Sequence, residues 1–227
     1  MTQDGRPRLL DLFCGAGGAA MGYHRAGFDV VGVDIKPQPR YPFAFWQRDA
    51  LEVLRCREGE EFEMGYFDAI HASPPCQAYS SLTGWGKGRS EKTHPDLVAE
   101  TRDLLRATGL PYVIENVEGA PLENAVRICG QALGLRVRRH RYFESNVMLL
   151  VPECQHPEPP VIVVRGSIGR KVFDPRRKAI APTLDEARLV MEMPWASKDE
   201  LTQAIPPAYT ELIGHQLISH IRARSAA

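Results

Sequence analysis

The stretch Arg8-Leu9-Leu10-Asp11-Leu12-Phe13-Cys14-Gly15-Ala16-Gly17-Gly18 decides the fold of this chain. Residues 8–13 form an apolar run typical of a short buried strand, and residues 14–18 form a glycine-rich turn. Residues 19–27 then predict a helix that ends at a glycine cap. A strand, a glycine turn and a helix in this order let the backbone approach a nucleotide-like ligand closely. A merely tight connection between strand and helix is the alternative.

A carboxylate ends the next predicted strand, residues 28–34, at Asp34. An acid at the end of the second strand suits the two hydroxyls of a ribose. Counted from Gly15 and Gly17, the third fixed position of the dinucleotide-binding fingerprint holds Ala20, a tolerated variant. The match to that fingerprint is therefore partial.

A thiol follows another predicted strand, residues 67–72, in the run Ser73-Pro74-Pro75-Cys76-Gln77. The two prolines fix φ and remove two backbone donors, so this connection has little freedom. Ligands of open α/β sheets bind at the carboxyl ends of the strands, and a nucleophile held in place has less entropy to lose on reacting. A buried structural cysteine is the alternative for a single thiol.

Polar residues also end a third predicted strand, residues 111–117, which carries Glu115 and Asn116. A carboxylate at the end of a buried strand is costly unless it has a partner or a chemical task. Because the carboxyl ends of parallel strands lie at one edge of a sheet, we expect Asp34, Cys76 and Glu115 along the same edge.

In their order and spacing these motifs resemble the C5-cytosine DNA methyltransferases. The matching runs are Asp11–Gly18, Pro75-Cys76-Gln77, Glu115-Asn116-Val117, Arg139-His140-Arg141 and, as in small phage-type members, Ala204–Gly214. The resemblance implies an α/β fold, doubly wound around a mostly parallel seven-stranded sheet of the S-adenosylmethionine-dependent methyltransferase, Rossmann-like type. It divides the chain into a catalytic and cofactor-binding part (1–144), a reduced target-recognition segment (145–201) and a C-terminal helix that returns to the catalytic part (202–227).

The same resemblance implies the catalytic roles. Cys76 is expected to attack C6 of a cytosine that has been flipped out of duplex DNA, which makes C5 reactive toward a methyl sulfonium. Glu115 is expected to assist at N3, for which it needs a raised pKa at neutral pH. Arg141 is expected to contact the cytosine O2, and Arg139 to brace the loop that carries the nucleophile.

The resemblance also implies that residues 13–18 wrap S-adenosylmethionine. Phe13 is expected against the adenine, Asp34 at the ribose and Asp49 at the adenine amino group. The other expected contacts are Cys14, Gly15, Ala16, Gly17, Gly18, Ile35, Ala50, Pro75 and Leu97. Asp49 is also placed to cap a helix at residues 50–55, and the two roles are compatible.

Double-stranded DNA is the expected partner, bound by a monomer or, alternatively, a dimer. The net charge is zero, but residues 136–178 hold ten Lys or Arg against four Asp or Glu, a basic band that can meet phosphates. The loop 77–92 has the composition of a lid that closes on DNA. Ordinary solvated surface is the alternative for both. The expected DNA contacts are Gln77, Ser80, Ser81, Lys87, Arg89, Asn116 and Arg165.

The chain departs from the family in three places. Residues 145–201 are too few for a typical recognition domain with its own core, and they hold a predicted strand at 161–166 and a predicted helix at 184–193. The Gln that usually precedes the spaced arginines is Val137, so one polar contact is missing. The usual Gly-Asn-Ser of the closing motif reads Pro206-Pro207-Ala208, which calls the cofactor contacts of that motif into question.

No metal site is expected. Cys154-Gln155-His156 offers two ligands without a second pair at metal spacing, and Cys129 falls on a predicted helix. His140 lies between two arginines on a predicted strand and is expected to face away from them. Trp195 is expected to be packed.

Cysteine usage and hydropathy indicate a cytoplasmic protein without a membrane partner. The five cysteines are scattered without paired spacing, which favours a reducing compartment. No apolar run reaches membrane-spanning length, and the N-terminus has no signal-peptide pattern.

Two other functions remain open at this point. One is cytosine-5 methylation of RNA, in particular tRNA, and the absence of the Cys-Phe-Thr tripeptide of the tRNA-acting branch argues against it. The other is a catalytically silent DNA-binding relative. The presence of Cys76, Glu115 and the glycine turn together argues against that loss of activity.

Overall fold

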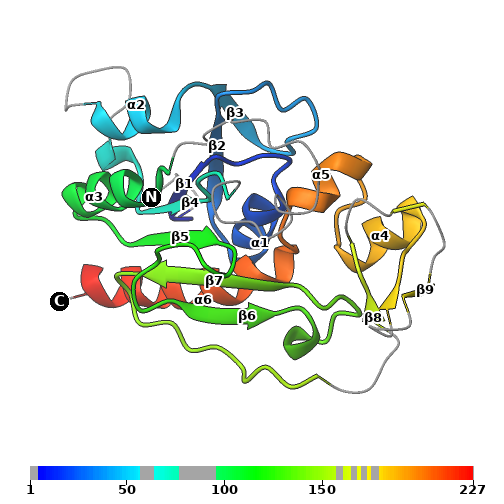
Figure 1. Ribbon diagram of the computed structural model, residues 1–227. Helices are drawn as coiled ribbons and strands as arrows, with labels where there is room; N and C mark the ends of the chain where they lie inside the picture. The colour runs from blue at the N-terminus through cyan, green and yellow to red at the C-terminus, as the bar shows by residue number, and fades with distance from the viewer. Residues whose placement is uncertain are drawn as a thin grey trace.

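A seven-stranded sheet forms the centre of the protein (Figure 1). The computed structural model describes residues 5–56, 64–76, 96–156, 161–164, 168–169, 173–174 and 179–226. The strand order is β3-β2-β1-β4-β5-β7-β6, and β7 runs antiparallel to both of its neighbours. The predicted fold class is therefore confirmed. The strands are β1 (Arg8–Leu12), β2 (Asp29–Asp34), β3 (Ala44–Gln47), β4 (Ala69–Ala72), β5 (Tyr112–Asn116), β6 (Val126–Cys129) and β7 (His140–Ser145).

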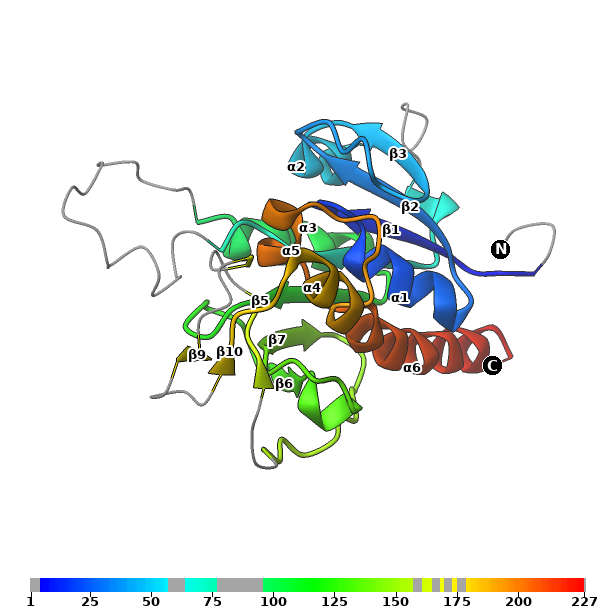
Figure 2. The ribbon, with the colours of Figure 1, turned by 90° about the vertical axis from the view of Figure 1, so that its right-hand side faces the viewer.

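Helices cover both faces of the sheet (Figures 1 and 2). Successive residues of a strand point to opposite faces, so Leu9 joins the core cluster beneath α1 and α6 whereas Leu10 joins the cluster on the side of α2 and α3. None of the helices in the described ranges is long and apolar enough to cross a membrane. The helices are α1 (Gly18–Ala26), α2 (Ala50–Arg55), α3 (Val98–Thr108) and α6 (Pro207–Ser225), with short 3₁₀ turns at Met64–Tyr66 and Gln131–Leu133.

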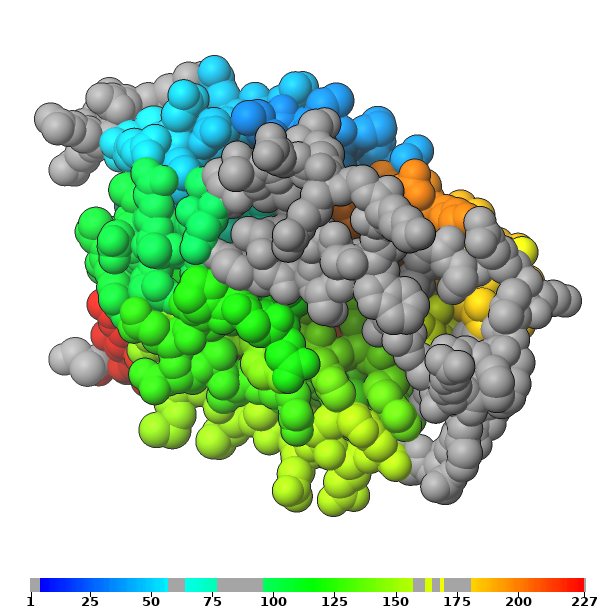
Figure 3. Space-filling model, viewed as in Figure 1, coloured from blue at the N-terminus to red at the C-terminus, as the bar shows by residue number. Residues whose placement is uncertain are grey.

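The outer surface follows the same arrangement. In the space-filling view, the blue and cyan residues around β3 and α2 lie along the top of this face (Figure 3). The green and lime residues of β5 to β7 and of the chain after β7 lie along the bottom. The two ends of the sheet thus form opposite sides of this face.

Helices α1 and α6 cross in close contact through two glycines. A Cβ atom at Gly22 would lie 2.1 Å from the carbonyl oxygen of Pro207, and Gly214 of α6 gives α1 similar access. The hydroxyl of Thr210 donates a hydrogen bond to the carbonyl of Ala19 at 2.8 Å. The closing motif of the chain is therefore fastened directly to the helix that follows the glycine turn.

The reduced segment between β7 and α6 packs onto the catalytic part. Its side chains form a third core cluster that includes Ala16 and Val137 from the catalytic part, and Val137 bridges to Ile162. Val137, which stands where the family usually has Gln, thus contributes apolar packing to this junction. The segment holds a small sheet of β8 (Val161–Ile162), β10 (Ala179–Ile180) and β9 (Phe173–Asp174), together with α4 (Leu184–Val190) and α5 (Lys198–Gln203).

Three predicted elements differ from those observed. Cys129 ends the strand β6 and is not on a helix, because its four-residue run pairs with β7. The strand predicted at 161–166 is limited to Val161–Ile162 in the described residues. The helix predicted at 184–193 ends at Val190, and Glu192, with φ of 56°, turns the chain away.

Enlarging Gly22 tests the helix crossing. In Gly22→Ala the new methyl group would meet the backbone of α6, so we expect the free energy of unfolding to fall by about 1–3 kcal/mol. This loss outweighs the roughly 1 kcal/mol by which alanine is favoured over glycine in a helix. The urea midpoint measures the change. Gly65→Ala, where the added carbon meets nothing within 4 Å, is the matched control. Equal midpoints for the two variants would contradict the close crossing.

Candidate active site

The ends of five strands meet at one edge of the sheet. β1 pairs in parallel with β2 and β4, and β4 pairs in parallel with β5. β7 runs the other way beside β5, with Tyr142 opposite Asn116, so its first residues reach the same edge. The prediction that Asp34, Cys76 and Glu115 share an edge is confirmed, and Arg141 joins them from β7.

Asn116 holds the loop that carries Cys76. Its buried side-chain amide donates a hydrogen bond to the carbonyl oxygen of Pro74 at 3.0 Å, and its oxygen accepts one from the amide of Val117 at 2.9 Å. The contact of Asn116 with DNA, which the family resemblance implies, stays a prediction. In this conformation its amide fixes the backbone two residues before the thiol.

The Cys76 thiol lies half-buried among charged neighbours. Burial raises its pKa, and the carboxylate of Glu115 raises it further, whereas the positive charges of Arg141 and Arg139 lower it. Because only the thiolate is strongly nucleophilic, the two arginines favour the reactive form and Glu115 opposes it. The reactivity of this thiol is therefore set by the balance of these charges.

Glu115 and Arg141 form a buried ion pair. Nε of Arg141 lies 2.9 Å from Oε1 of Glu115, and both side chains are largely hidden from solvent. Burial raises the pKa of Glu115, and the charge of Arg141, a hydrogen bond from Ser73 and the charge of Arg139 counteract that effect. The net pKa is raised, so Glu115 takes up a proton more easily than an exposed glutamate.

A buried histidine is linked to Glu115 through Ser73. His71 accepts or donates one hydrogen bond with Tyr23 Oη and one with Ser73 Oγ, each at 3.0 Å. Complete burial lowers the pKa of His71 to about 3, so its ring is neutral. Ser73 in turn bonds Glu115. Sequence reasoning missed this chain, since an inward-facing histidine in an apolar strand is its only sequence signal.

Arg139 joins the site to the reduced segment. Its buried guanidinium donates hydrogen bonds to three backbone carbonyls, those of Val164, Leu201 and Thr202. The contact of Arg139 with the nucleophile loop, implied by the family resemblance, stays a prediction. What the structure shows is a cation anchored in the segment that acts electrostatically on Cys76.

The glycine turn has the backbone that its sequence predicts. Gly15 and Gly17 have φ of 49° and 80°, and Phe13 also has positive φ, at 56°. A Cβ on Gly15 would meet nothing within 4 Å, so the turn is open on that side. Trp195 packs here as expected, and its indole NH bonds the carbonyl of Ala16 at 2.8 Å. Burial raises the pKa of the thiol of Cys14, which makes it unreactive.

Asp34 binds the glycine turn through its side chain, and the exposed Ile35 follows it in the chain. The two carboxylate oxygens of Asp34 accept the amides of Gly15 and Lys36 at 3.0 and 2.9 Å, which leaves a further lone pair on each oxygen. The side chain of Ile35 is 63% exposed, unusual for a large apolar residue. Together they offer polar contacts beside an apolar surface.

Four other predicted cofactor residues lie in the described part of the chain. Asp49 caps α2 by accepting the amides of Leu51 and Glu52, as its alternative role predicted. Ala50 is the buried first residue of that helix. Leu97 precedes α3 and is half-buried, as is Pro75.

Most of the predicted DNA contacts lie outside the described residues. These are Gln77, Ser80, Ser81, Lys87, Arg89 and Arg165, and the lid predicted at 77–92 lies there as well.

Comparison with known proteins defines the family. Residues 8–129, more than half of the chain, match the C-5 cytosine-specific DNA methylases, and the chain belongs to that family. It is 28% identical over 123 residues to the type II methyltransferase M.AgeI of Thalassovita gelatinovora, which covers 49% of this chain and 28% of that protein. It is 24% identical over 225 residues to M.AquIA of Picosynechococcus sp., which covers 88% and 90% of the two chains.

The chain is short beside several relatives, since it spans 28% of M.AgeI and 35% of M.AplI from Arthrospira platensis. Solved structures share its fold. A candidate DNA modification methyltransferase encoded within an E. coli prophage aligns with TM-score 0.62 at 16% identity, over 95% of this chain and 99% of the other. The Dnmt2 methyltransferase of S. pombe aligns with TM-score 0.56 at 11% identity, over 97% and 99%.

Two substitutions with opposite signs test the electrostatics at Cys76. Glu115→Gln removes the negative charge that raises the pKa of Cys76, so alkylation of the thiol should begin at lower pH. Arg141→Gln removes a positive charge that lowers this pKa, so alkylation should begin at higher pH. The measurement is the pH profile of iodoacetamide labelling, quantified on the Cys76 peptide by mass spectrometry.

The control is Arg222→Gln, an exposed cation on α6, which should leave the labelling profile unchanged. Circular dichroism confirms that each variant is folded. Shifts of the same sign in both site variants would contradict the proposed charge balance.

Proposed function

We propose that this protein transfers a methyl group from S-adenosylmethionine to C5 of cytosine in double-stranded DNA. The observation that carries the proposal is the position of Cys76, on a tethered loop at the sheet edge, beside the buried Glu115–Arg141 pair. Membership of the C-5 cytosine-specific DNA methylase family supports it.

The residue types suit this reaction. C5 of cytosine is a weak nucleophile, and addition of the Cys76 thiolate to C6 makes C5 electron-rich. S-Adenosylmethionine, when bound, supplies the methyl group on a sulfonium. Loss of the proton at C5 then restores the C5–C6 double bond and expels Cys76 as a thiolate. The base is flipped out of the duplex, because C6 is inaccessible within the stack.

The buried pair has a role at the pyrimidine ring. Addition at C6 increases the negative charge at N3 and O2. The raised pKa of Glu115 equips it to hold a proton for N3, and the guanidinium of Arg141 is suited to O2. Both groups act on charge that develops during the addition.

The residues at the glycine turn fit S-adenosylmethionine. The remaining lone pairs of Asp34 suit the ribose hydroxyls, and the exposed face of Ile35 suits the adenine ring. Phe13 would lie against the adenine, and residues 14–18 would lie along the methionine part, where the open side of Gly15 leaves room. Asp49, Ala50, Pro75 and Leu97 would complete the wall around the adenine.

DNA would bind across the same edge as a substrate of one protein monomer. The basic residues between 136 and 178, other than Arg139 and Arg141, would meet phosphates, together with the predicted contacts that follow Cys76. The reduced segment would read a short or loosely defined sequence.

Removing the charge of Asp34 tests the cofactor site. Asp34→Asn places an amide NH₂ where a carboxylate oxygen accepts hydrogen bonds, so we expect binding of S-adenosylmethionine to weaken roughly 10- to 100-fold. Isothermal titration calorimetry measures this. Asp29→Asn, at the exposed opposite end of β2, is the matched control and should bind as wild type. Equal affinity in both variants would remove Asp34 from the site.

Methyl transfer tests the function itself. Wild-type protein with labelled S-adenosylmethionine should form 5-methylcytosine in unmethylated plasmid, identified by mass spectrometry. Cys76→Ser should lower the rate by at least about 10³-fold, whereas Cys56→Ser, another partly buried cysteine, should not. DNA carrying 5-fluorocytosine should form a denaturant-stable complex through Cys76. Fluorine replaces the C5 proton whose loss expels Cys76, so the bond between Cys76 and the base should persist.

The alternatives give distinct results. Transfer to tRNA and not to plasmid would replace DNA by RNA as the substrate. Salt-dependent DNA binding with bound cofactor and no transfer to either nucleic acid would indicate a silent relative. Transfer by Cys76→Ser at the wild-type rate would exclude the thiol as the nucleophile.

A further inference from the structure

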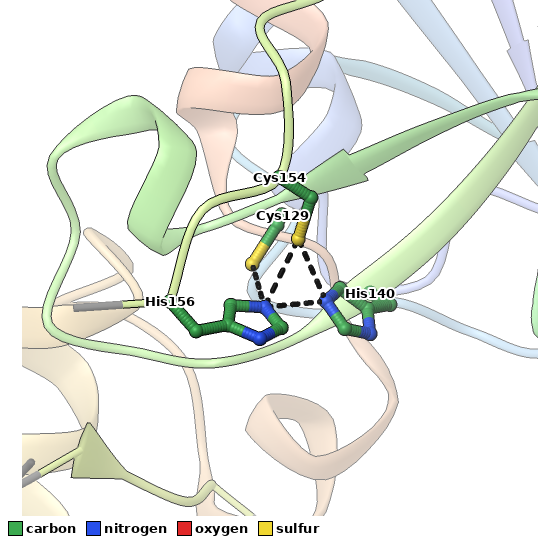
Figure 4. A group of neighbouring side chains, drawn as sticks. All are labelled: Cys129, His140, Cys154 and His156. Carbon is green, nitrogen blue, oxygen red and sulfur yellow. Dashed lines mark hydrogen bonds between the residues drawn. The ribbon is translucent and has the colours of Figure 1, made fainter. Parts of the chain in front are cut away.

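Two cysteines and two histidines converge beside the outer strands of the sheet (Figure 4). They are Cys129, His140, Cys154 and His156, and their ligand atoms all lie within 4.8 Å of one another. The sequence spacing gives no reason to expect this group, since the four residues are spread over 28 positions and Cys129 falls on a predicted helix. The fold brings them together.

The backbone fixes each half of the cluster. Cys129 and His140 are direct partners across the antiparallel pair of β6 and β7, so the ladder sets their separation. Cys154 and His156 lie two residues apart on the chain that follows β7, and both side chains point toward the strand pair (Figure 4). His140 faces away from Arg139 and Arg141, as the strand alternation predicted.

The spacing of the ligand atoms is close to that around one metal ion. Nε2 of His140 and Nε2 of His156 are 3.0 Å apart, and Sγ of Cys154 lies 3.2 and 3.0 Å from these two nitrogens. Sγ of Cys129 lies 3.6 Å from Nε2 of His156. A tetrahedral zinc ion places its nitrogen ligands about 3.3 Å apart, and a nitrogen and a sulfur about 3.6 Å apart.

Hydrogen bonds alone account poorly for the close approach of these four side chains. A given imidazole nitrogen either donates or accepts a hydrogen bond. The three contacts among His140, His156 and Cys154 can therefore all be hydrogen bonds only if one donor is shared between two acceptors. A cation at the centre would instead receive one lone pair from each atom.

The ligand set selects the metal and its role. Two thiolates with two imidazoles in a tetrahedral array suit Zn²⁺, and the two thiolate charges neutralise it. All four positions are protein ligands, which is typical of a structural rather than a catalytic site. The cluster ranges from the buried Cys129 to the exposed His156, so an ion can reach it from solvent.

We propose that Cys129, His140, Cys154 and His156 bind a structural zinc ion. The ion would fasten the chain after β7 to the β6–β7 pair, just before that chain enters the small sheet of the reduced segment. It would also hold the first residue of β7, between the two arginines that reach the active site. The site stands on its own geometry and does not depend on the identity of the methyl acceptor.

Metal analysis tests the proposal. Protein purified in reducing buffer and dialysed against metal-free buffer should retain one zinc ion per chain by plasma mass spectrometry. The metal-free protein should take up Co²⁺ with the visible bands of a tetrahedral ion and a thiolate charge-transfer band. Chelator treatment should lower the thermal midpoint of the wild type.

Variants separate the site from the fold. His156→Gln and Cys154→Ser remove ligands on the outer chain without opening the core, and both should lose zinc and the charge-transfer band of the cobalt form. His215→Gln, exposed on α6, and Cys56→Ser are matched controls that should keep both signals.

Three results would overturn the proposal. One is folded wild-type protein that binds neither zinc nor cobalt. The second is unchanged zinc content in a His156→Gln and Cys154→Ser double variant. The third is a disulfide between Cys129 and Cys154 in the non-reduced peptide map of protein purified under reducing conditions.

Discussion

The antiparallel insertion of β7 between β5 and β6 is the constraint on which both sites depend. A parallel strand in this position would place its last residues at the edge that holds Cys76 and Glu115. The antiparallel β7 places its first residues there. Arg141 thereby reaches Glu115, and a buried carboxylate at this position is tolerable only with such a partner. Because neighbouring residues of a strand point to opposite faces, the side chain of His140 points away from Glu115 and lies beside Cys129, Cys154 and His156.

The charges around Cys76 are coupled in a direction that suits the proposed chemistry. The reaction needs a thiolate on Cys76 and a proton for N3 of the base at the same time. A proton on Glu115 removes the negative charge that raises the pKa of Cys76, so protonation of the acid favours ionisation of the thiol. Arg141 supports the thiolate whether or not Glu115 holds its proton. The site therefore resists the unproductive state in which both groups are ionised.

Local sequence predicted the parts of the structure that local physics decides. The runs predicted as strands at residues 8–13, 28–34, 67–72 and 111–117 contain the strands β1, β2, β4 and β5, and the glycine cap at Gly27 ended α1 as expected. The turn chemistry of residues 13–18 fixed both the fold class and the edge at which Cys76 lies. The order of the motifs carried the family assignment.

Contacts between distant segments were not predictable in the same way. The run Val126–Cys129 is only four residues long, and so short an apolar run does not distinguish strand from helix. The bonds of His71 with Tyr23 and Ser73 join residues that no periodicity links. The metal-ligand cluster depends on the pairing of β6 with β7, so the error at Cys129 concealed it.

The described part of the reduced segment packs onto the catalytic part. A domain of this size buries too little surface to be stable alone. Here its apolar side chains complete a cluster that begins on the catalytic part with Ala16 and Val137. Arg139 binds its backbone carbonyls from within the active site. The proposed zinc would fasten the chain that leads into it.

Because each of these attachments is made by residues next to the catalytic edge, movement of the segment on DNA would be transmitted directly to Arg139 and, through β7, to the Glu115–Arg141 pair. Recognition and catalysis would then be parts of one cooperative unit. A separately folded recognition domain, in contrast, could move without changing the Glu115–Arg141 pair.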